Sequence, residues 1–257
     1  MDVDGVLLDI DGVLTVSWEP IPGSIEALDL LRDRGLPFRL ITNTTTHTRD
    51  ALASTLREAG FDVEPNMIVT AVVATASYVR AYHPGARVLV LSDGDPREDL
   101  EGVEVVDPGE EADVVVIGGA SEGFTYEAMN QIFRLLMDGA ALVGMHRNMY
   151  WRTSDGLELD GGAYIAGLEE AAGVSATICG KPAAAFFGSA LDMLGTSPSR
   201  TAMVGDDIVN DVLGAQAAGL SGVLVKTGKF LPADLAKGKP DVVLDSLADL
   251  PDLLGIR

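Results

Sequence analysis

The sequence predicts an α/β fold in which helices cover both faces of a parallel sheet. Short runs rich in valine, leucine and isoleucine alternate with helical patterns along most of the 257 residues. These runs are apolar at successive positions, which is typical of strands that are buried on both faces. In such sheets ligands bind at the carboxyl ends of the strands, so polar residues at those ends are the first candidates for a site.

The first part of the chain alternates between strands and helices. The segment GVLLDI at residues 5–10 is apolar enough for a central strand. The helix predicted over residues 24–35 begins at Ser24, has one apolar face and ends on glycine, which are common start and stop signals. The other expected elements are a strand at residues 36–43, a helix at 49–60 and a strand at 66–71.

A second α/β block occupies the middle of the chain. Valine-rich strands are expected at residues 86–93 and 112–119. The helix expected at residues 125–139 has apolar residues spaced three and four apart, which gives it one buried face. A strand at residues 141–146 and a helix at 162–173 complete the block.

The last part of the chain returns to the pattern of the first. Its expected elements are a strand running into a loop at residues 200–207, a helix at 208–219, a strand at 221–228, and a strand and a helix within 240–254. This return predicts a Rossmann-like, parallel-sheet core formed by residues 1–78 and 178–257. A smaller α/β domain, residues 79–177, is inserted between them.

The composition argues against several classes of partner and site. With a net charge of −21 and a pI of about 4.3, the surface repels nucleic acids and anionic membranes, so neither is an expected partner. Three histidines lie far apart, which argues against a histidine-built zinc site, and a single cysteine, Cys179, excludes an intrachain disulfide. Because no run is of membrane-spanning length and no signal peptide is apparent, a cytoplasmic protein is expected.

The pattern Asp-x-Asp-Gly-Val-Leu occurs twice, starting at Asp2 and at Asp9. Only the second copy follows a complete apolar strand, and alternation places Asp9 and Asp11 on the same side of it. Gly12 then allows the backbone to turn close to a bound group. We therefore assign the site to Asp9 and Asp11, the alternative being an ordinary acidic turn at a strand end.

Three further segments place polar residues at strand ends. In LITNTTT, Thr42 and Asn43 end a strand and suit a phosphate oxygen, although a cap for the next helix is the more common role of such a segment taken alone. In CGKP, Lys181 precedes a helix and could neutralise carboxylates and phosphate, unless it is a solvated loop lysine.

The segment VGDDIVND brings three carboxylates together at the end of another strand. Asp211 lies one helical turn beyond Asp207, on the same face. Carboxylates this close repel one another unless a cation lies between them, and oxygen ligands favour Mg²⁺. A helix-capping role would explain Asp207 and Asp211, but it would not explain Asp206 at the strand end.

Taken in order, the four segments resemble the motifs of the haloacid dehalogenase (HAD) superfamily of phosphohydrolases. The resemblance spans the whole chain, and the inserted domain is similar to the larger α/β cap of the NagD-like phosphatases. Within that group, TNTT, MNQIFRLLMDGA and DGLELDGG are similar to the branch that holds phospholysine phosphohistidine inorganic pyrophosphate phosphatase. The resemblance implies a phosphatase whose substrate is a small phosphorylated molecule.

The resemblance also implies roles for individual residues. Asp9 would be the nucleophile that forms an aspartyl-phosphate, and Asp11 the general acid and base. Mg²⁺ would be held by Asp9, the Asp11 carbonyl and Asp206, with support from Asp207 or Asp211. Thr42 and Lys181 would act in catalysis, and Gly12, Asn43 and Thr44 in binding the substrate.

The segment MHRNMYWRTSDG at residues 145–156 is unusually basic and aromatic for so acidic a chain. We interpret it as a specificity loop in which His146 and Arg147 meet the leaving group; an ordinary surface hairpin is the alternative. A homodimer formed through the cap is a candidate assembly. Other functions that remain open are a phosphotransferase or mutase of the same superfamily, and a non-catalytic receiver-like phosphate-binding module.

Overall fold

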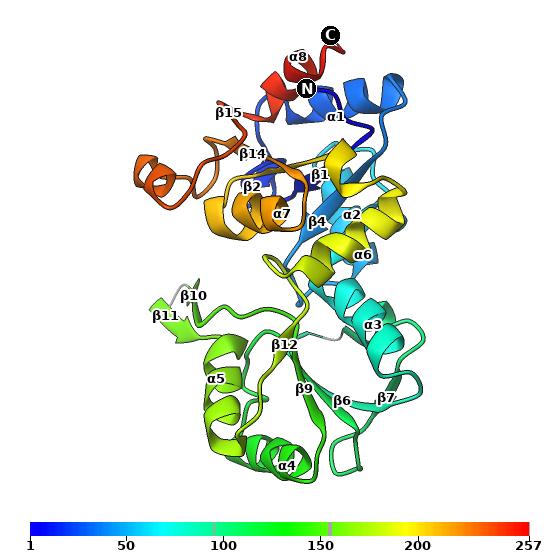
Figure 1. Ribbon diagram of the computed structural model, residues 1–257, viewed down its shortest axis with the longest axis vertical. Coiled ribbons are helices and arrows are strands. Elements are labelled where there is room, and N and C mark those ends of the chain that lie inside the picture. The colour runs from blue at the N-terminus through cyan, green and yellow to red at the C-terminus, as the bar shows by residue number, and fades with distance from the viewer. Residues whose placement is uncertain (95, 154–155, 257) are drawn as a thin grey trace. The chain divides into compact units, whose positions relative to one another are not determined.

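The computed structural model describes residues 1–94, 96–153 and 156–256, without the side chains of residues 151–153. It confirms the α/β class. The chain forms two compact units, and the second interrupts the first in sequence (Figure 1). The first unit comprises Met1–Thr42, Arg49–Val69 and Lys181–Arg257, and the second comprises Asn43–Thr48 and Thr70–Gly180.

The first unit is built on a six-stranded sheet in the order β15-β14-β13-β1-β4-β5. The pairings of β1 with β4 and β13, and of β14 with β13 and β15, are parallel. Strands from both ends of the chain thus lie in one sheet (Figure 1). The strands of this unit, which include a short antiparallel pair, are β1 (Gly5–Asp9), β2 (Thr15–Val16), β3 (Glu19–Pro20), β4 (Phe38–Thr42), β5 (Ile68–Thr70), β13 (Thr201–Gly205), β14 (Ser221–Val225) and β15 (Val242–Leu244).

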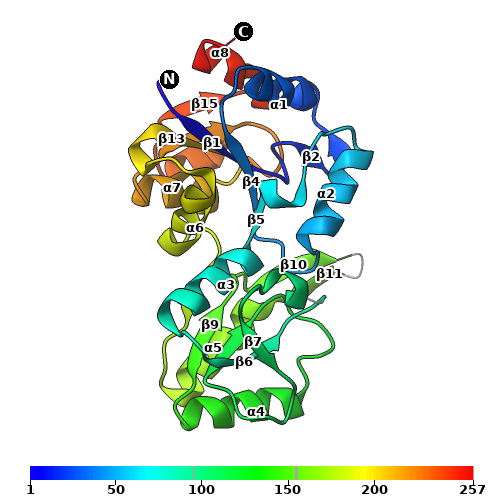
Figure 2. The same cartoon turned by 90° about the vertical axis from the view of Figure 1, so that its right-hand side faces the viewer.

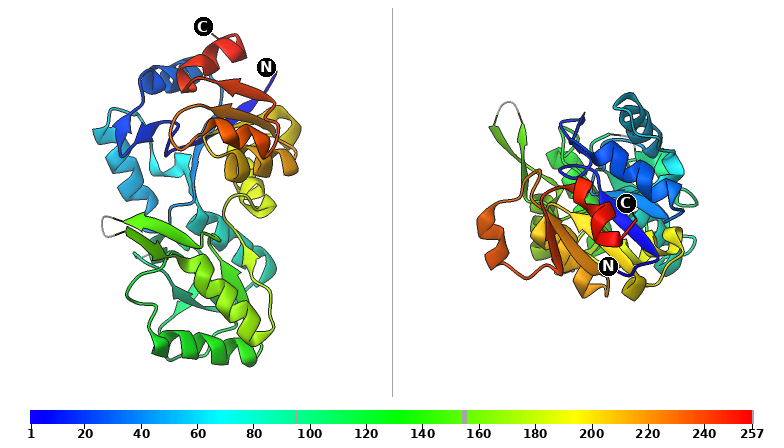
Figure 3. Two further views of the ribbon diagram at one scale, coloured as in Figure 1. Left: turned by 90° about the vertical axis from the view of Figure 1, so that its left-hand side faces the viewer. Right: turned by 90° about the horizontal axis from the view of Figure 1, so that it is seen from above.

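Helices cover both faces of this sheet, as the apolar strands predict (Figure 2). Val6 and Leu8 of β1 share a buried cluster with residues of α1 and α2. Figure 3 shows the N-terminus beside α8, where the ammonium of Met1 donates to the carbonyl of Leu253 at 2.6 Å. The helices are α1 (Ser24–Asp33), α2 (Arg49–Glu58), η1 (Pro65–Met67), α6 (Ala184–Leu194), η3 (Pro198–Arg200), η4 (Ile208–Leu213), α7 (Gly214–Ala217), η5 (Pro232–Ala236), η6 (Leu247–Asp249) and α8 (Leu250–Leu254).

The second unit has its own five-stranded parallel sheet, in the order β12-β9-β8-β6-β7, and a separate antiparallel hairpin. Alternate residues of β8 face opposite ways. Val114 and Val116 pack with α3, whereas Val115 and Ile117 pack with α4 and α5. The elements are α3 (Ala71–Tyr82), β6 (Arg87–Leu91), η2 (Pro96–Asp99), β7 (Glu104–Val106), β8 (Val114–Ile117), α4 (Tyr126–Met137), β9 (Ala141–Gly144), β10 (Tyr150–Thr153), β11 (Gly156–Leu159), α5 (Gly161–Ala172) and β12 (Thr177–Ile178).

Three local features differ from the pattern expected from the sequence. Helix α3 is not apparent from the sequence, because every residue from Ala71 to Ala76 is buried and the segment shows no helical periodicity. The helix expected at residues 208–219 is a π-helix, η4, followed by the short α7. The domain boundary expected after residue 78 lies inside α3, whereas the main segment of the second unit begins at Thr70.

Candidate active site

The last residue of β1 carries the first candidate carboxylate. Since Val6 and Leu8 face α1 and α2, alternation along the strand directs Leu7 and Asp9 to the opposite face. This is the face on which α6 and α7 lie (Figure 2), and Asp9 accepts a hydrogen bond from Lys181, three residues before α6. Only 4% of Asp9 is exposed.

Lys181 bridges two buried carboxylates. Its Nζ donates to Asp9 Oδ1 at 2.6 Å and to Asp211 Oδ1 at 2.7 Å. All three residues are buried, and Asp211 is inaccessible. Residues from β1, η4 and the segment before α6 are thus held together by one ammonium group. Charge-assisted hydrogen bonds of this length are strong in a site that excludes water.

Asp206 follows β13 and is enclosed by backbone. Its Oδ2 accepts a hydrogen bond from the N–H of Lys229 at 2.8 Å. Gly12 and Gly228 have φ angles of +84° and +62°, and a Cβ on either would lie 2.2 Å from this same oxygen. Both positions therefore require glycine, and Gly12 is explained by the close approach of a carboxylate.

One oxygen of this enclosed carboxylate lacks a hydrogen bond. Among the described residues, Asp206 Oδ1 is buried without a hydrogen-bond partner. Carboxylate oxygens of Asp9, Asp206 and Asp211 all lie within 4.8 Å of one another. Because leaving a buried carboxylate oxygen unsatisfied is unfavourable, this arrangement fits a bound cation with oxygen ligands, the donor set that Mg²⁺ prefers.

Crowding and burial change the acidities of this cluster. Burial raises the pKa of Asp9 to about 8, with Lys181 opposing the shift and Asp211 and Asp206 adding to it. Burial also raises the pKa of Asp206 to about 6, although the N–H of Lys229 opposes it. Burial alone would lower the pKa of Lys181, but Asp211 and Asp9 outweigh it and raise that pKa above its usual value. Lys181 therefore stays protonated.

Asp207 is the N-cap of η4. Its Oδ1 accepts the N–H groups of Val209 and Asn210 at 2.9 and 3.0 Å, and its Oδ2 accepts from the Asn210 side chain at 2.7 Å. The capping alternative thus describes this residue well. Asp211, in contrast, has one oxygen on Lys181 and the other on the N–H of Asp207 at 3.1 Å. It belongs to the cluster of three carboxylates.

Lys229 is a residue that the sequence motifs miss. Its Nζ lies 3.3 Å from Asp207 Oδ2 and 4.0 Å from Asp206 Oδ1. Burial alone would lower the pKa of Lys229, but the surrounding carboxylates, led by Asp206 and Asp207, raise it. The only signal in the sequence is its position after TG at a strand's carboxyl end.

The remaining candidates from the first two motifs lie in different places. Asp11 is exposed and forms a backbone bridge with Thr15. Thr42 ends β4, next to β1, and is buried. Asn43 and Thr44 belong to the second unit and are half-buried. A Cβ on Gly180 would lie 2.7 Å from Asn43 Oδ1.

His146 and Arg147 are both engaged within the second unit. His146 is buried, and its Nδ1 accepts the N–H of Asn148 at 3.3 Å. Burial lowers its pKa, although Asp160 opposes the shift. Arg147 forms a bidentate ion pair with Glu169 of α5. The following segment forms the β10–β11 hairpin, while Asp155 and the side chains of Trp151 and Arg152 lie outside the described residues. The specificity role of this segment stays a prediction.

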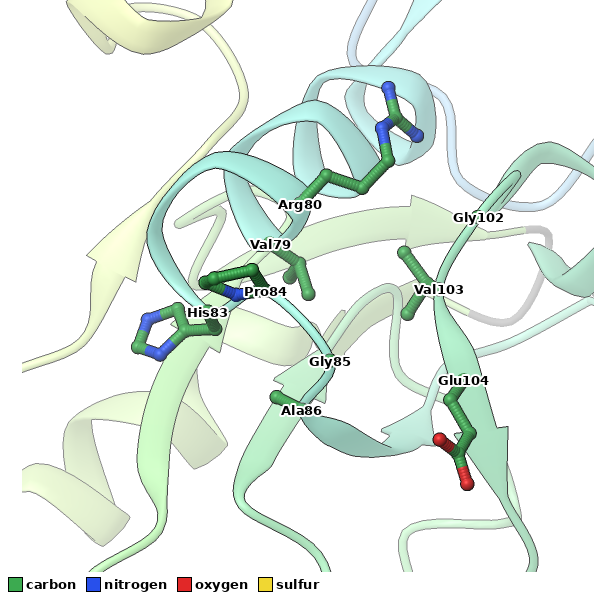
Figure 4. A pocket seen from close by; sticks show the side chains of 9 residues that line it. All are labelled: Val79, Arg80, His83, Pro84, Gly85, Ala86, Gly102, Val103 and Glu104. Carbon is green, nitrogen blue, oxygen red and sulfur yellow. The ribbon is translucent and has the colours of Figure 1, made fainter.

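A pocket of about 390 Å³ lies elsewhere in the second unit, between the end of α3 and the beginnings of β6 and β7 (Figure 4). Val79, Pro84 and Val103 form its apolar walls. Arg80 beside it donates to the carbonyl of Glu101 and to Ser77. Because the pocket lies at the amino ends of the strands, it is at the edge opposite to the one where such sheets bind ligands.

The first Asp-x-Asp-Gly copy has a different environment from the second. Asp2 and Asp4 are exposed, and both form ion pairs with Arg200, at 2.6 and 2.8 Å. Hydrogen bonds from Arg200 lower the pKa of both carboxyls. These residues connect the start of the chain to the segment before β13 and have no contact with Lys181 among the hydrogen bonds and ion pairs of the described residues.

The buried acid at residue 9 predicts a pH dependence of stability in the metal-free protein. Folded Asp9 keeps its proton up to about pH 8, whereas the unfolded chain releases it near pH 3.8. The folded state then holds more protons in this window, so the free energy of unfolding falls as the pH rises through it. Asn at this position does not titrate. Thermal unfolding in EDTA should therefore show wild type losing stability relative to Asp9→Asn between about pH 4 and pH 8; parallel pH profiles would contradict the assignment.

Comparison with known proteins adds an independent observation. A family model described as haloacid dehalogenase-like hydrolase matches residues 6–106, and one described as HAD-hydrolase-like matches residues 178–250. The chain is 40% identical over 235 residues to haloacid dehalogenase-like hydrolase domain-containing protein 2 of Bos taurus, covering 91% of this chain and 88% of the relative. It is 38% identical to phospholysine phosphohistidine inorganic pyrophosphate phosphatase of Danio rerio, covering 96% and 91%.

Solved structures resemble the whole chain as well. The p-nitrophenyl phosphatase from Archaeoglobus fulgidus superposes with a TM-score of 0.90 at 31% identity, covering 99% of this chain and all of that one (100%). NagD from E. coli K-12 superposes with a TM-score of 0.87 at 28% identity, covering 97% and 98%. Separately, no helix in the described part of the chain has the length and apolarity needed to cross a bilayer.

Proposed function

Because the chain belongs to the haloacid dehalogenase-like hydrolases, we propose that it is a Mg²⁺-dependent phosphatase acting through an aspartyl-phosphate on Asp9. The family matches confirm the resemblance carried by the four sequence motifs and the expectation of an enzyme of this family. The observation that carries the proposal is the buried ammonium of Lys181 between Asp9 and Asp211, with the unsatisfied Oδ1 of Asp206 in the same cluster.

The chemistry follows from the groups at the end of β1. An oxygen of Asp9 forms a bond to phosphorus while the bond to the leaving group breaks, and Asp11 gives its proton to the departing atom. Water then attacks the phosphorus of the aspartyl-phosphate and loses its proton to Asp11. Inorganic phosphate leaves, and Asp9 is regenerated. Lys181 holds the Asp9 carboxylate in place and offsets negative charge near the phosphoryl group.

Asp9 and Asp206 would hold the cation, together with the backbone carbonyl of Asp11. Asp211 would support them through Lys181 and the N–H of Asp207. When bound, Mg²⁺ would reduce the repulsion between a carboxylate nucleophile and a phosphate dianion. Thr42, at the end of the neighbouring strand, together with Asn43 and Thr44, would supply polar contacts to phosphate oxygens.

For the substrate, we propose a small phosphorylated metabolite, pyrophosphate or a phosphoramidate. The name of the Danio rerio relative refers to P–N and P–O–P bonds, and that of the Archaeoglobus fulgidus neighbour to an aryl phosphate. All three types of bond can be broken by the same displacement at phosphorus, because only the leaving atom differs. The cytoplasmic location and the homodimer through the cap stay predictions.

Turnover assays on the purified 257-residue chain test this function. We expect p-nitrophenyl phosphate to be hydrolysed with Mg²⁺, EDTA to abolish the activity, and Ca²⁺ to inhibit it, because calcium prefers more ligands at longer distances. A panel of pyrophosphate, phosphohistidine, phospholysine and sugar phosphates then ranks the substrates. Activity that persists in EDTA, or no turnover of any member of the panel, would reject the proposal. Phosphate transferred to a sugar instead of water would favour the phosphotransferase alternative.

The glycine beside Asp206 provides a matched pair of variants. Ala at position 12 or 35 must adopt a positive φ, which costs roughly 1–2 kcal/mol in either case. Only the Cβ at position 12 meets Asp206, whereas Gly35 has open space around it. Gly12→Ala should therefore raise the Mg²⁺ concentration for half-maximal activity by about tenfold or more, and Gly35→Ala should not. Equal effects of the two substitutions would show that Gly12 matters only for backbone conformation.

A further inference from the structure

Lys229 lies beside the three buried carboxylates of Asp9, Asp206 and Asp211, and its side chain reaches solvent. Its backbone N–H holds Asp206 Oδ2 at 2.8 Å, and its ammonium lies 4.0 Å from Asp206 Oδ1, the oxygen without a hydrogen bond. The same ammonium lies 3.3 Å from Asp207 Oδ2. The side chain of Lys229 is 60% exposed, whereas that of Asp206 is 2% exposed. Lys229 can therefore move away from the cluster without leaving its own charge buried.

The net charge of the cluster around Lys229 matches a divalent cation. When all four carboxyls are ionised, as ligands and neighbours of a bound cation would be, Asp9, Asp206, Asp207 and Asp211 contribute four negative charges, and Lys181 and Lys229 contribute two positive ones. The formal sum is therefore −2, which a divalent cation cancels. Lys181 is buried and forms ion pairs with both Asp9 and Asp211, which hold its ammonium in place. Lys229 is thus the cation of this cluster whose position can respond to a bound metal.

We propose that Lys229 is a positioning residue whose ammonium takes the place of the divalent cation in the metal-free protein and competes with the cation for Asp206. The inference rests on the cation site of the proposed function. A metal ion on Asp206 Oδ1, at about 2.1 Å, would lie within about 6 Å of the ammonium as it stands. Two cations at that distance repel each other measurably, even at a solvent-exposed site. Lys229 must therefore turn toward Asp207 when the metal binds.

The test compares Lys229→Met with Lys226→Met as a matched control. Lys226 belongs to the same segment, is 48% exposed and pairs with Asp245 at 2.8 Å, outside the cluster. Calorimetric titration of the metal-free proteins with Mg²⁺ gives the affinity, and thermal unfolding with and without Mg²⁺ gives the stability. Lys229→Arg retains the positive charge and should behave like wild type.

We expect Lys229→Met to bind Mg²⁺ about three- to tenfold more tightly than wild type at low salt, and the difference to shrink at high salt. Its metal-free form should unfold at a lower temperature than wild type, and saturating Mg²⁺ should close that gap. Lys226→Met should bind Mg²⁺ within about twofold of wild type, because its charge is farther away and screened.

Each other outcome overturns the inference in a distinguishable way. Weaker Mg²⁺ binding by Lys229→Met would show that Lys229 supports the geometry of Asp206. Unchanged affinity, or equal tightening in Lys226→Met, would show that the ammonium does not compete locally. If wild type itself fails to bind Mg²⁺, the cation site and the proposed function are rejected together with this inference.

Discussion

Asp9→Asn is expected to lower phosphatase turnover by about 10³-fold or more. The neutral amide is a poor nucleophile and a poor ligand for a divalent cation. The fold should persist, because an amide oxygen can still accept a hydrogen bond from Lys181. Steady-state hydrolysis of p-nitrophenyl phosphate with saturating Mg²⁺ measures the loss, and thermal unfolding confirms that the variant is folded.

The first copy of the motif supplies the control for that experiment. Asp2→Asn and Asp4→Asn remove carboxylates from the same sequence pattern, but these carboxylates are exposed and paired with Arg200. Exposed ion pairs contribute little, so both variants should keep wild-type turnover within about twofold. An inactive Asp2→Asn together with an active Asp9→Asn would show that the site had been assigned to the wrong copy.

The sequence alone was sufficient to predict that several charged residues lie close together. Asp9 ends one apolar strand, Asp206 follows another, and Lys181 precedes a helix. Since the carboxyl ends of parallel strands share one edge of a sheet, the strand pattern predicts that such residues meet. The structure places Lys181 on Asp9, and Asp206 in the same cluster. Their catalytic roles stay predictions until the variants are measured.

Other parts of the site depend on contacts that no sequence pattern reports. The choice between Asp207 and Asp211 depends on which carboxylate the backbone of η4 uses as its cap. Gly228 and the N–H of Lys229 approach Asp206 from a loop after β14, distant in sequence from Gly12. Helix α3 is not apparent from the sequence because every residue from Ala71 to Ala76 is buried, so its first half lacks the polar face that marks an amphipathic helix.

The role of Arg147 in the second unit also could not be predicted from the sequence. Arg147 stands out in the sequence as a basic residue in an acidic chain, and basic residues suit phosphate. In the structure both of its terminal nitrogens reach Glu169, which also accepts the N–H of Ala176 at 2.8 Å. The charge pattern of a sequence does not distinguish an arginine that forms an ion pair between a loop and a helix from one that binds a ligand.

Lys181→Met is expected to have the largest effect on stability. The substitution leaves the carboxylates of Asp9 and Asp211 buried without the ammonium that both contact. Removing one partner of a buried ion pair typically costs about 3–5 kcal/mol, because the remaining charge is uncompensated. Turnover should also fall by about 10²-fold or more, since the nucleophile loses the group that holds it. Denaturant unfolding in EDTA and hydrolysis of p-nitrophenyl phosphate measure the two effects.

A double variant separates charge from packing. In Lys181→Met/Asp211→Asn, one buried negative charge is removed together with the positive one. If uncompensated charge causes the loss, the double variant should recover much of the stability of the metal-free protein, although not its activity, because Asp9 still lacks its partner. If the double variant is less stable than Lys181→Met alone, the loss comes from the packing of the lysine side chain. Lys181 would then support the fold and not the electrostatics of the site.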